Sequence, residues 1–265
     1  MLDGINKFPK NREIYLELAD LYVSKNIYRK AIEVYQRVLW FNKEDQFILL
    51  RIGNCFLSLK EYSLAIDYYN MIQKPEAEML YNKSFAFSRL GKPDDAIKNL
   101  EKIFEYNLTS NIPYILMAEL QFSKRQYRKA IEYIEISEEK FGKNKTHFYL
   151  KGIAFSHLNQ WLKAYMEFHK ADKMHLESAQ FFRAFGIANE KIGKTAKAID
   201  LLLRSINLAP SDPSGYIELI NLYLKHNRVL EAYNIMRNSK NNIPLSFAIS
   251  LLQRQITERL RNDRS

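Results

Sequence analysis

An alanine that returns at a nearly constant spacing constrains this chain more than any other feature. Each time it follows a short basic or polar lead-in and opens an amphipathic stretch, as in YRKAIEVYQRVL at 28–39 and YRKAIEYIEI at 127–136. The seven copies are Ala31, Ala65, Ala96, Ala130, Ala164, Ala198 and Ala232. Successive gaps are 34, 31, 34, 34, 34 and 34 residues. A period of this length and regularity predicts a solenoid of stacked supersecondary units.

Two helical faces surround each alanine. Twelve residues before it the chain carries a small residue in six cases of seven: Ala19, Gly53, Ser84, Ala118, Gly152, Gly186 and the exception Ile220. Four residues after it stands a large apolar residue: Tyr35, Tyr69, Leu100, Ile134, Phe168, Leu202 and Met236. Helices that cross closely need a small residue at the crossing, and residues four apart share one helical face. Each repeat is therefore predicted to be a pair of amphipathic helices.

The sequence also indicates where the turn between the two helices lies. Five residues before each alanine stand Asn26, Lys60, Gly91, Arg125, Asn159, Gly193 and Asn227. Five of these seven are glycine or asparagine, which tolerate the left-handed conformation that ends many helices. Pro93, two residues after Gly91, favours the start of the next helix. The chain holds only 8 glycines and 7 prolines and no β-branched alternation, so an all-α fold is expected.

The pattern of large, small, aromatic and alanine positions resembles the tetratricopeptide repeat over residues 12–245. In the sixth repeat the matching residues are Phe182, Phe185, Gly186, Asn189, Ala198, Leu202, Ser205 and Pro210. In the first they are Tyr15, Leu18, Ala19, Tyr22, Ala31, Tyr35 and Val38. Gln121 and Asn189 depart from an aromatic position and Ile220 from a small one, which loosens single contacts. The resemblance implies a right-handed superhelical solenoid of seven helix-turn-helix repeats with a C-terminal capping helix.

The repeat boundaries divide the whole chain. We expect an N-terminal half-repeat stub at 1–11 and a C-terminal capping helix and tail at 246–265. The seven repeats between them are 12–45, 46–76, 77–110, 111–144, 145–178, 179–212 and 213–245. The stub indicates either a chain cut from a longer array or a natural lid over the first repeat. A three-residue deletion at 73–76 shortens the link into the third repeat, which is either a change in superhelical path or a tolerated loop trim.

The last helix is amphipathic, and its apolar stripe consists of Phe247, Ile249, Leu252, Ile256 and Leu260. A stripe that faces inward while the other face is polar is typical of a capping helix. A basic helix that binds a membrane surface or a partner is the alternative. The formal net charge is +10, but lysines and glutamates are mixed through every repeat. This mixing favours a solvated surface. An acidic partner is the alternative, and nucleic acid is not favoured as a partner.

We expect no enzyme. The chain has no glycine-rich phosphate loop, no GxSxG and no HExxH motif, so no catalytic residue, no metal ligand and no cofactor is assigned. Its five histidines lack metal-ligand spacing, and the one cysteine, Cys55, cannot complete a cysteine-rich zinc site. We find no apolar run of membrane-spanning length and no signal segment, and we expect a cytoplasmic location.

The resemblance implies that the first helix of each repeat lines a concave groove. At the fifth repeat position stand Leu16, Leu50, Tyr81, Ile115, Tyr149, Arg183 and Ile217, and at the ninth Asp20, Asn54, Phe85, Glu119, Ile153, Ile187 and Asn221. The middle of the groove is thus apolar, and exposed apolar area often marks an interaction site. Packing of some of these residues against the neighbouring repeat is the other interpretation. The family's carboxylate clamp is rejected, because Leu16 and Asp20 replace its lysine and asparagine.

We therefore predict a non-catalytic scaffold or adaptor that binds a partly apolar protein segment in this groove. The candidate apolar anchors are Leu50, Tyr81, Phe85, Ile115, Tyr149, Ile153 and Ile187, and Asn54, Glu119 and Arg183 would fix the polar register. The alternative is the targeting arm of a longer enzyme or of a membrane-anchored assembly or secretion-chaperone protein. The oligomeric state and the partner's identity are left open.

Overall fold

The computed structural model describes residues 12–239 and 247–262, and this part of the chain is all-helical, with fifteen helices and no strand. It divides into two compact units, Met1–Gln126 and Tyr127–Ser265. The predicted stub 1–11, the predicted boundary at 245 and Pro244 lie outside the described residues. The predicted fourth repeat, 111–144, contributes its two helices to different units. The repeat boundaries themselves stay predictions.

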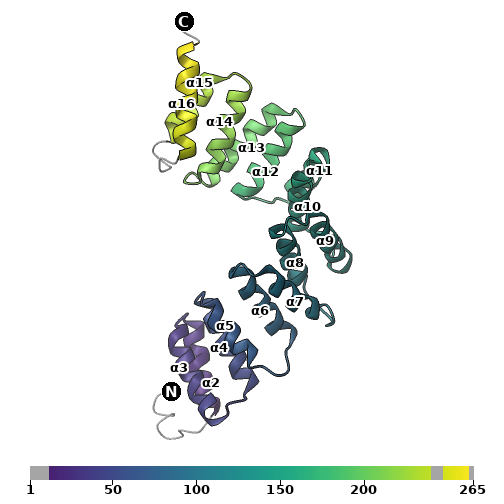
Figure 1. Ribbon diagram of the computed structural model, residues 1–265, viewed down its shortest axis with the longest axis vertical. Coiled ribbons are helices and arrows are strands. Elements are labelled where there is room, and N and C mark those ends of the chain that lie inside the picture. The colour runs from purple at the N-terminus through teal and green to yellow at the C-terminus, as the bar shows by residue number, and fades with distance from the viewer. Residues whose placement is uncertain (1–11, 240–246, 263–265) are drawn as a thin grey trace. The chain divides into compact units, whose positions relative to one another are not determined.

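The first unit consists of helices that run back and forth in sequence order (Figure 1). They are α2 (Arg12–Ser24), α3 (Tyr28–Phe41), α4 (Gln46–Ser58), α5 (Tyr62–Asn70), α6 (Ala77–Arg89), α7 (Pro93–Ile103) and α8 (Ile112–Ser123). The helices α2 and α3, α4 and α5, and α6 and α7 pack as pairs, and each pair packs on the next. The helix α7 begins at Pro93, as the sequence predicts.

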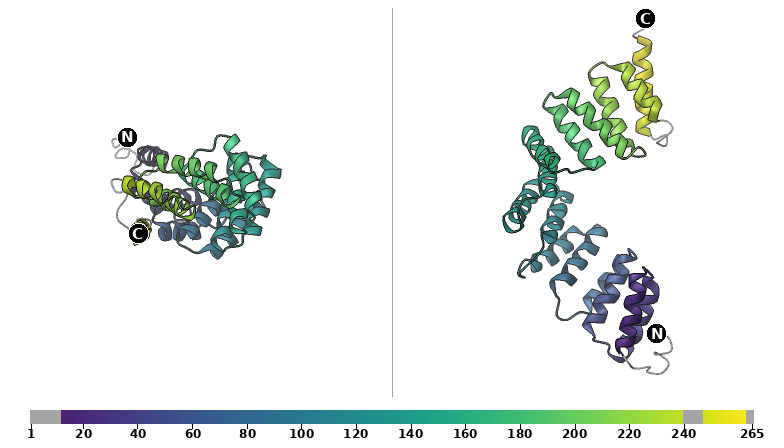
Figure 2. Two further views of the ribbon diagram at one scale, coloured as in Figure 1. Left: turned by 90° about the horizontal axis from the view of Figure 1, so that it is seen from above. Right: turned by 180° about the vertical axis from the view of Figure 1, so that it is seen from behind.

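The second unit continues the same alternation. Its helices are α9 (Tyr127–Phe141), α10 (Lys145–His157), α11 (Trp161–Lys173), α12 (Ala179–Lys191), α13 (Thr195–Leu208), α14 (Pro213–Lys225), α15 (Val229–Ser239) and α16 (Phe247–Asn262). The views in Figure 2 show the pairs α10–α11, α12–α13 and α14–α15 side by side. In α16, three residues of the predicted apolar stripe, Ile249, Leu252 and Ile256, are buried against α14 and α15. The side chains of Phe247 and Leu260 lie outside the described residues.

The predicted small residue of the first helix and the predicted large residue of the second meet where the two helices of a pair cross. A Cβ added at Gly53 would lie 2.4 Å from Cε1 of Tyr69, and one added at Gly152 would lie 2.4 Å from Cε1 of Phe168. Both rings are fully buried. The backbone of the first helix therefore lies directly against an aromatic ring of the second, at a separation that a side chain would prevent.

The turns inside the repeats have the predicted left-handed residue. All seven positions named from the sequence have positive φ, from 53° to 81°, and this includes Lys60 and Arg125, which are neither glycine nor asparagine. The following amide closes each turn: Glu61 N donates to the Phe56 carbonyl at 2.9 Å, and Gln126 N donates to the Gln121 carbonyl at 2.8 Å. This six-residue hydrogen bond is the Schellman ending, which holds the left-handed residue even without glycine.

The deletion at 73–76 shortens a helix as well as the link. The helix α5 has 9 residues, while α3 has 14 and α13 has 14. Residues 71–76 then cross to α6 without regular helix. Two hydrogen bonds fix this linker, from Lys74 N to Gln46 Oε1 at 2.9 Å and from Tyr106 Oη to the Pro75 carbonyl at 2.8 Å. The deletion therefore produces a defined local structure.

Candidate functional site

The predicted groove residues of the first unit lie on three neighbouring helices. We call this set the unit-1 face: Leu50 and Asn54 on α4, Tyr81 and Phe85 on α6, and Ile115 and Glu119 on α8. The helices α4 and α6 contact each other, as do α6 and α8. Glu119 is exposed and the other five residues are partly exposed. The unit-1 face thus brings four apolar side chains to an accessible surface without burying any of them completely.

Asn54 is engaged within the protein. Its Oδ1 accepts from Tyr69 Oη at 2.8 Å and from Asn82 Nδ2 at 2.9 Å, and its Nδ2 donates to Glu78 Oε1 at 3.1 Å. In the preceding pair Tyr35 Oη donates to Asp20 Oδ1 at 2.6 Å in the same way. In these two repeats the residue at the ninth position, Asp20 or Asn54, is polar and accepts a hydrogen bond from the tyrosine hydroxyl of the second helix. The sequence analysis assigned Asn54 to partner binding, but its amide already joins α4, α5 and α6.

Burial and charge perturb the pKa values of the two titratable groups of the unit-1 face, Tyr81 and Glu119. Burial raises the pKa of the Tyr81 hydroxyl, and the nearby Glu119 carboxylate raises it further. Burial also raises the pKa of Glu119 above its usual range. A partly desolvated carboxylate beside a phenol is a strong hydrogen-bond acceptor for a donor that approaches it. Tyr81 and Glu119 therefore combine apolar area with a polar contact point on adjacent helices.

The predicted groove residues of the second unit form the unit-2 face: Tyr149 and Ile153 on α10, and Arg183 and Ile187 on α12. All four are partly exposed. Tyr149 and Ile153 also pack against the aromatic core of this unit, and the Tyr149 ring lies 6.1 Å from the Phe181 ring. The packing interpretation therefore applies to these two residues, and partner binding by the part of their surface that stays accessible remains a prediction.

A pocket of about 310 Å³ extends the unit-2 face towards α14, and its lining includes Ile187, Glu218 and Asn221. Burial raises the pKa of Glu218, while the Arg183 guanidinium opposes that shift. Burial likewise raises the pKa of Tyr149, and Arg183 opposes that shift. Hydrogen bonds from Ser214 lower the pKa of Asp212, and Arg183 adds a smaller effect in the same direction. Arg183 is therefore close enough to act electrostatically on residues of α10 and α14 as well as lying on α12. Arg183 was predicted from the sequence as a groove residue, whereas Glu218 was not.

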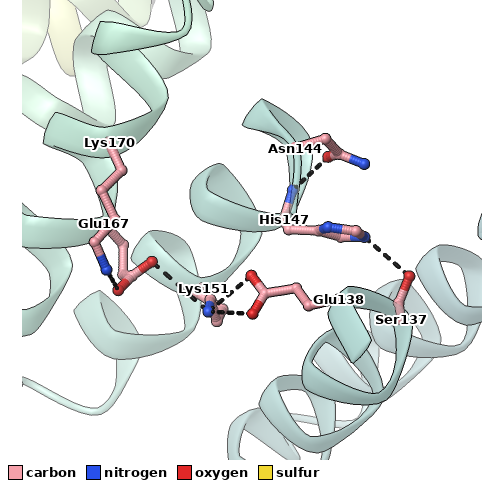
Figure 3. A network of polar contacts seen from close by, with 7 residues as sticks. All are labelled: Ser137, Glu138, Asn144, His147, Lys151, Glu167 and Lys170. Carbon is pink, nitrogen blue, oxygen red and sulfur yellow. Dashed lines mark hydrogen bonds and ion pairs between the residues drawn. The ribbon is translucent and has the colours of Figure 1, made fainter. Parts of the chain in front are cut away.

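A second feature that the sequence analysis missed is a buried polar cluster between α9, α10 and α11, shown in Figure 3. Lys151 Nζ lies 2.8 Å from the Glu138 carboxylate and 3.8 Å from Glu167 Oε2. His147 Nε2 lies 2.9 Å from Ser137 Oγ, and both residues are fully buried. Burial lowers the pKa of His147. The cluster joins three helices through buried polar contacts, so we interpret it as structural.

The signal for this cluster was present in the sequence. The seventh repeat position is Leu18, Ile52, Lys83, Met117, Lys151, Phe185 and Leu219. A lysine at a position that is otherwise apolar indicates a buried charge with a partner. Lys151 has such a partner, and burial lowers the pKa of Lys83, which is partly exposed.

A third missed feature is a pocket beside the shortened helix, which we call the α4–α6 pocket. Its volume is about 310 Å³, and its lining consists of Gln46, Phe47, Leu50, Ile72, Lys74, Glu76 and Met79. Phe47 is 44% exposed although it is a large aromatic residue. The pocket adjoins the unit-1 face through Leu50, which belongs to both.

No group of three or more histidine, cysteine, aspartate or glutamate side chains among the described residues is placed to hold a metal ion. No helix in residues 12–239 and 247–262 is both long and apolar enough to cross a membrane.

Comparison with known proteins connects this architecture to one family. Two tetratricopeptide-repeat models match, one over residues 16–78 and the other over residues 77–109. The fold is similar to the C-terminal part of a TPR repeat-containing protein from Cytophaga hutchinsonii, with a TM-score of 0.69 and 18% identity over 89% of this chain and 98% of that one. Residues 16–109 of this chain therefore consist of tetratricopeptide repeats (TPRs).

Other relatives of the TPR chain are larger. A chain of the APC/C hetero-tetramer Cut9–Hcn1 has a TM-score of 0.66 and 17% identity, over 96% of this chain and 57% of that one. At such identity the likeness shows the fold alone. The human intraflagellar transport protein 88 homolog is 27% identical over 150 residues, which is 48% of this chain and 18% of that protein. This chain therefore spans less than a fifth of that relative's length.

Proposed function

We propose that this TPR protein is a non-catalytic scaffold or adaptor that binds a protein segment on the first helices of its repeats. The observation that carries the proposal is the unit-1 face. Four apolar side chains, Leu50, Tyr81, Phe85 and Ile115, are kept partly exposed on three adjacent helices. Apolar area that remains accessible on a folded surface is the usual mark of an interaction site. The tetratricopeptide repeats of residues 16–109 support the same conclusion.

The segment that suits the unit-1 face is partly apolar with a hydrogen-bond donor. Tyr81 and Ile115 offer area for apolar anchors, and the exposed Glu119 offers an acceptor beside them. An amphipathic helix or an extended strand with alternating anchors would satisfy both. The unit-2 face provides a comparable site with opposite polarity, because Arg183 stands there among Tyr149 and Ile187. We also propose a cytoplasmic location, since Cys55 is a free buried cysteine that a reducing compartment would preserve.

The test is affinity capture from the source cell's extract with two matched variants. Tyr81→Ser with Ile115→Ser removes the apolar centre of the unit-1 face, and Leu64→Ser removes an exposed leucine of α5 outside that face. Both are checked for an unchanged helical signal and unfolding midpoint. The proposal expects a protein retained by the wild type and by Leu64→Ser but lost from the double variant.

Retention of the same proteins by all three chains would contradict the proposal. Loss from Leu64→Ser alone would also contradict it, because binding would then use the second helices of the repeats. For a partner that the double variant no longer retains, we expect the binding free energy to be weaker by roughly 2–4 kcal/mol, which is typical for the loss of a central aromatic anchor.

A further inference from the structure

We propose that the α4–α6 pocket is a subsite for one large apolar side chain of a peptide that carries a carboxylate beside that side chain. The inference rests on the proposed function, since it gives the unit-1 face a defined anchor point. It also goes further, because it specifies the chemistry of the residue that is bound.

The pocket exists because α5 ends early. In repeats of full length the second helix continues for about another turn, as α3 does to Phe41 and α13 does to Leu208. Here the helix stops at Asn70, and Ile72 of the linker forms one wall of the pocket. The hydrogen bonds at Lys74 N and at the Pro75 carbonyl hold the linker at this place. The pocket is therefore preformed, and binding does not have to order its wall.

The lining favours an apolar occupant. Phe47, Leu50, Ile72 and Met79 supply apolar surface from α4, the linker and α6. A volume of about 310 Å³ lies at the low end of ligand pockets, which are roughly 300–1,000 Å³, so one aromatic side chain suits it better than a complete small molecule. The pocket on the unit-2 face has a similar volume, but Glu190, Lys191, Glu218 and Lys225 line it. The two pockets thus select different chemistry.

Two cations beside the Phe47 wall favour an anionic neighbour, although neither of them lines the pocket itself. The Arg51 guanidinium lies 4.8 Å from the centroid of the Phe47 ring, and the Arg12 guanidinium lies 5.8 Å from it. Arg12 pairs with Asp45 at 2.9 Å, whereas no ion pair engages Arg51 among the residues that the structure describes. The Lys74 side chain lines the same pocket, opposed there by Glu76. A carboxylate next to the bound side chain would therefore meet Arg51, a cation already stacked on the pocket wall.

The experiment uses small probes, so it needs no identified partner. The full chain is labelled at its methyl groups and titrated with indole-3-propionate, which joins an aromatic ring to a carboxylate. Tryptamine, which joins the same ring to an ammonium group, is titrated in parallel. We expect chemical-shift changes concentrated at the methyls of Leu50, Ile72 and Met79, with a Kd of about 1 mM for a fragment of this size. Tryptamine should bind at least about threefold more weakly, because it lacks the carboxylate.

Three variants sharpen the test. Leu50→Trp fills the pocket and should abolish the shifts, whereas Leu64→Trp places the same residue elsewhere on the unit and should leave them. Arg51→Gln should remove the preference for the carboxylate probe while the apolar binding remains. Phe47→Ser provides a second way to weaken binding if Leu50→Trp does not fold.

The proposal is overturned if indole-3-propionate at 10 times the expected Kd leaves the three methyls unshifted, or if shifts spread evenly over the chain. Equal affinity for tryptamine would overturn the charge preference. Because Tyr81 and Ile115 do not line this pocket, the capture experiment can fail while the titration succeeds, and the two failures are distinguishable.

Discussion

The contact between Gly152 and Phe168 allows a quantitative test of how these repeats are packed. A Cβ at Gly152 would lie 2.4 Å from Cε1 and 2.5 Å from Cδ1 of the Phe168 ring. That ring is fully buried, and its centroid lies 6.2 Å from Phe181 and 6.0 Å from Phe185. Since other rings surround it, Phe168 has little room to retreat. Gly152→Ala should therefore strain the pair α10–α11.

Two opposing effects set the size of the change. Alanine gains about 1 kcal/mol over glycine in a helix interior. Overpacking in a close-packed core costs about 1–3 kcal/mol, and the enclosed ring places this case in the upper half of that range. We expect Gly152→Ala to lower the free energy of unfolding by about 1–2 kcal/mol. Gly186 and Leu202 are the equivalent pair in the sixth repeat, and there a Cβ on the glycine would lie 3.0 Å from Leu202 Cγ, a milder clash. Replacing Phe168 by leucine should therefore relieve part of the strain of Gly152→Ala. We expect the double variant to show a favourable coupling of about 1 kcal/mol.

The assay can report on the second unit alone, because the chain has two tryptophans, Trp40 in the first unit and Trp161 in the second. A Trp40→Phe background leaves Trp161 as the single indole for urea unfolding followed by fluorescence. If Gly152→Ala is as stable as its parent or more stable, with an unchanged m-value, the close approach of backbone and ring does not explain the small residue in this repeat.

Three further outcomes follow from particular residues. Lys60 has φ 61°, so Lys60→Gly should raise the free energy of unfolding by about 0.5–1 kcal/mol, and a urea midpoint that falls would contradict this. The pKa of His147 is lower in the folded chain than the usual 6.5, so its contribution is complete above about pH 6.5 and is lost as the pH falls towards the folded pKa. His147→Gln should therefore flatten the fall in unfolding free energy between about pH 7 and pH 5, and an unchanged slope would refute the assignment. Lys151→Ala leaves the Glu138 carboxylate buried without its cation and should cost about 3–5 kcal/mol, much of which Glu138→Gln should restore; a loss under about 1 kcal/mol would show that water reaches the site.

The sequence predicted the helices because their determinants are local and repeated. Gly91 and Asn26 mark turns through their own conformational preferences, and the same register then located Lys60 and Arg125, whose identities give no such signal. The small residue Gly152 and the large residue Phe168 were predicted from the same register, and the structure adds that they are in close contact. Each of these features involves residues within one repeat, so the 34-residue period was enough to place them.

The features that the sequence did not predict depend on neighbours outside the repeat. The hydrogen bonds of Asn54 to Tyr69, Asn82 and Glu78 join three helices and leave no local pattern, so they were not predicted; its role in partner binding stays a prediction. The α4–α6 pocket depends on the path that the linker takes after the deletion, and the number of deleted residues does not predict that path. Phe47 was not predicted as a pocket residue, because an apolar residue at the start of a helix can be buried or exposed and its sequence position does not distinguish the two.

Site-specific photo-crosslinking tests the central claim most directly. A benzophenone amino acid is placed at Tyr81 on the unit-1 face, and at Leu64 on α5 as the control, and the cells are irradiated. The account predicts a discrete crosslinked protein from position 81, absent at position 64 and competed by the unlabelled wild-type chain. A crosslink of equal yield from Leu64, or one from Leu64 alone, would contradict binding on the first helices of the repeats.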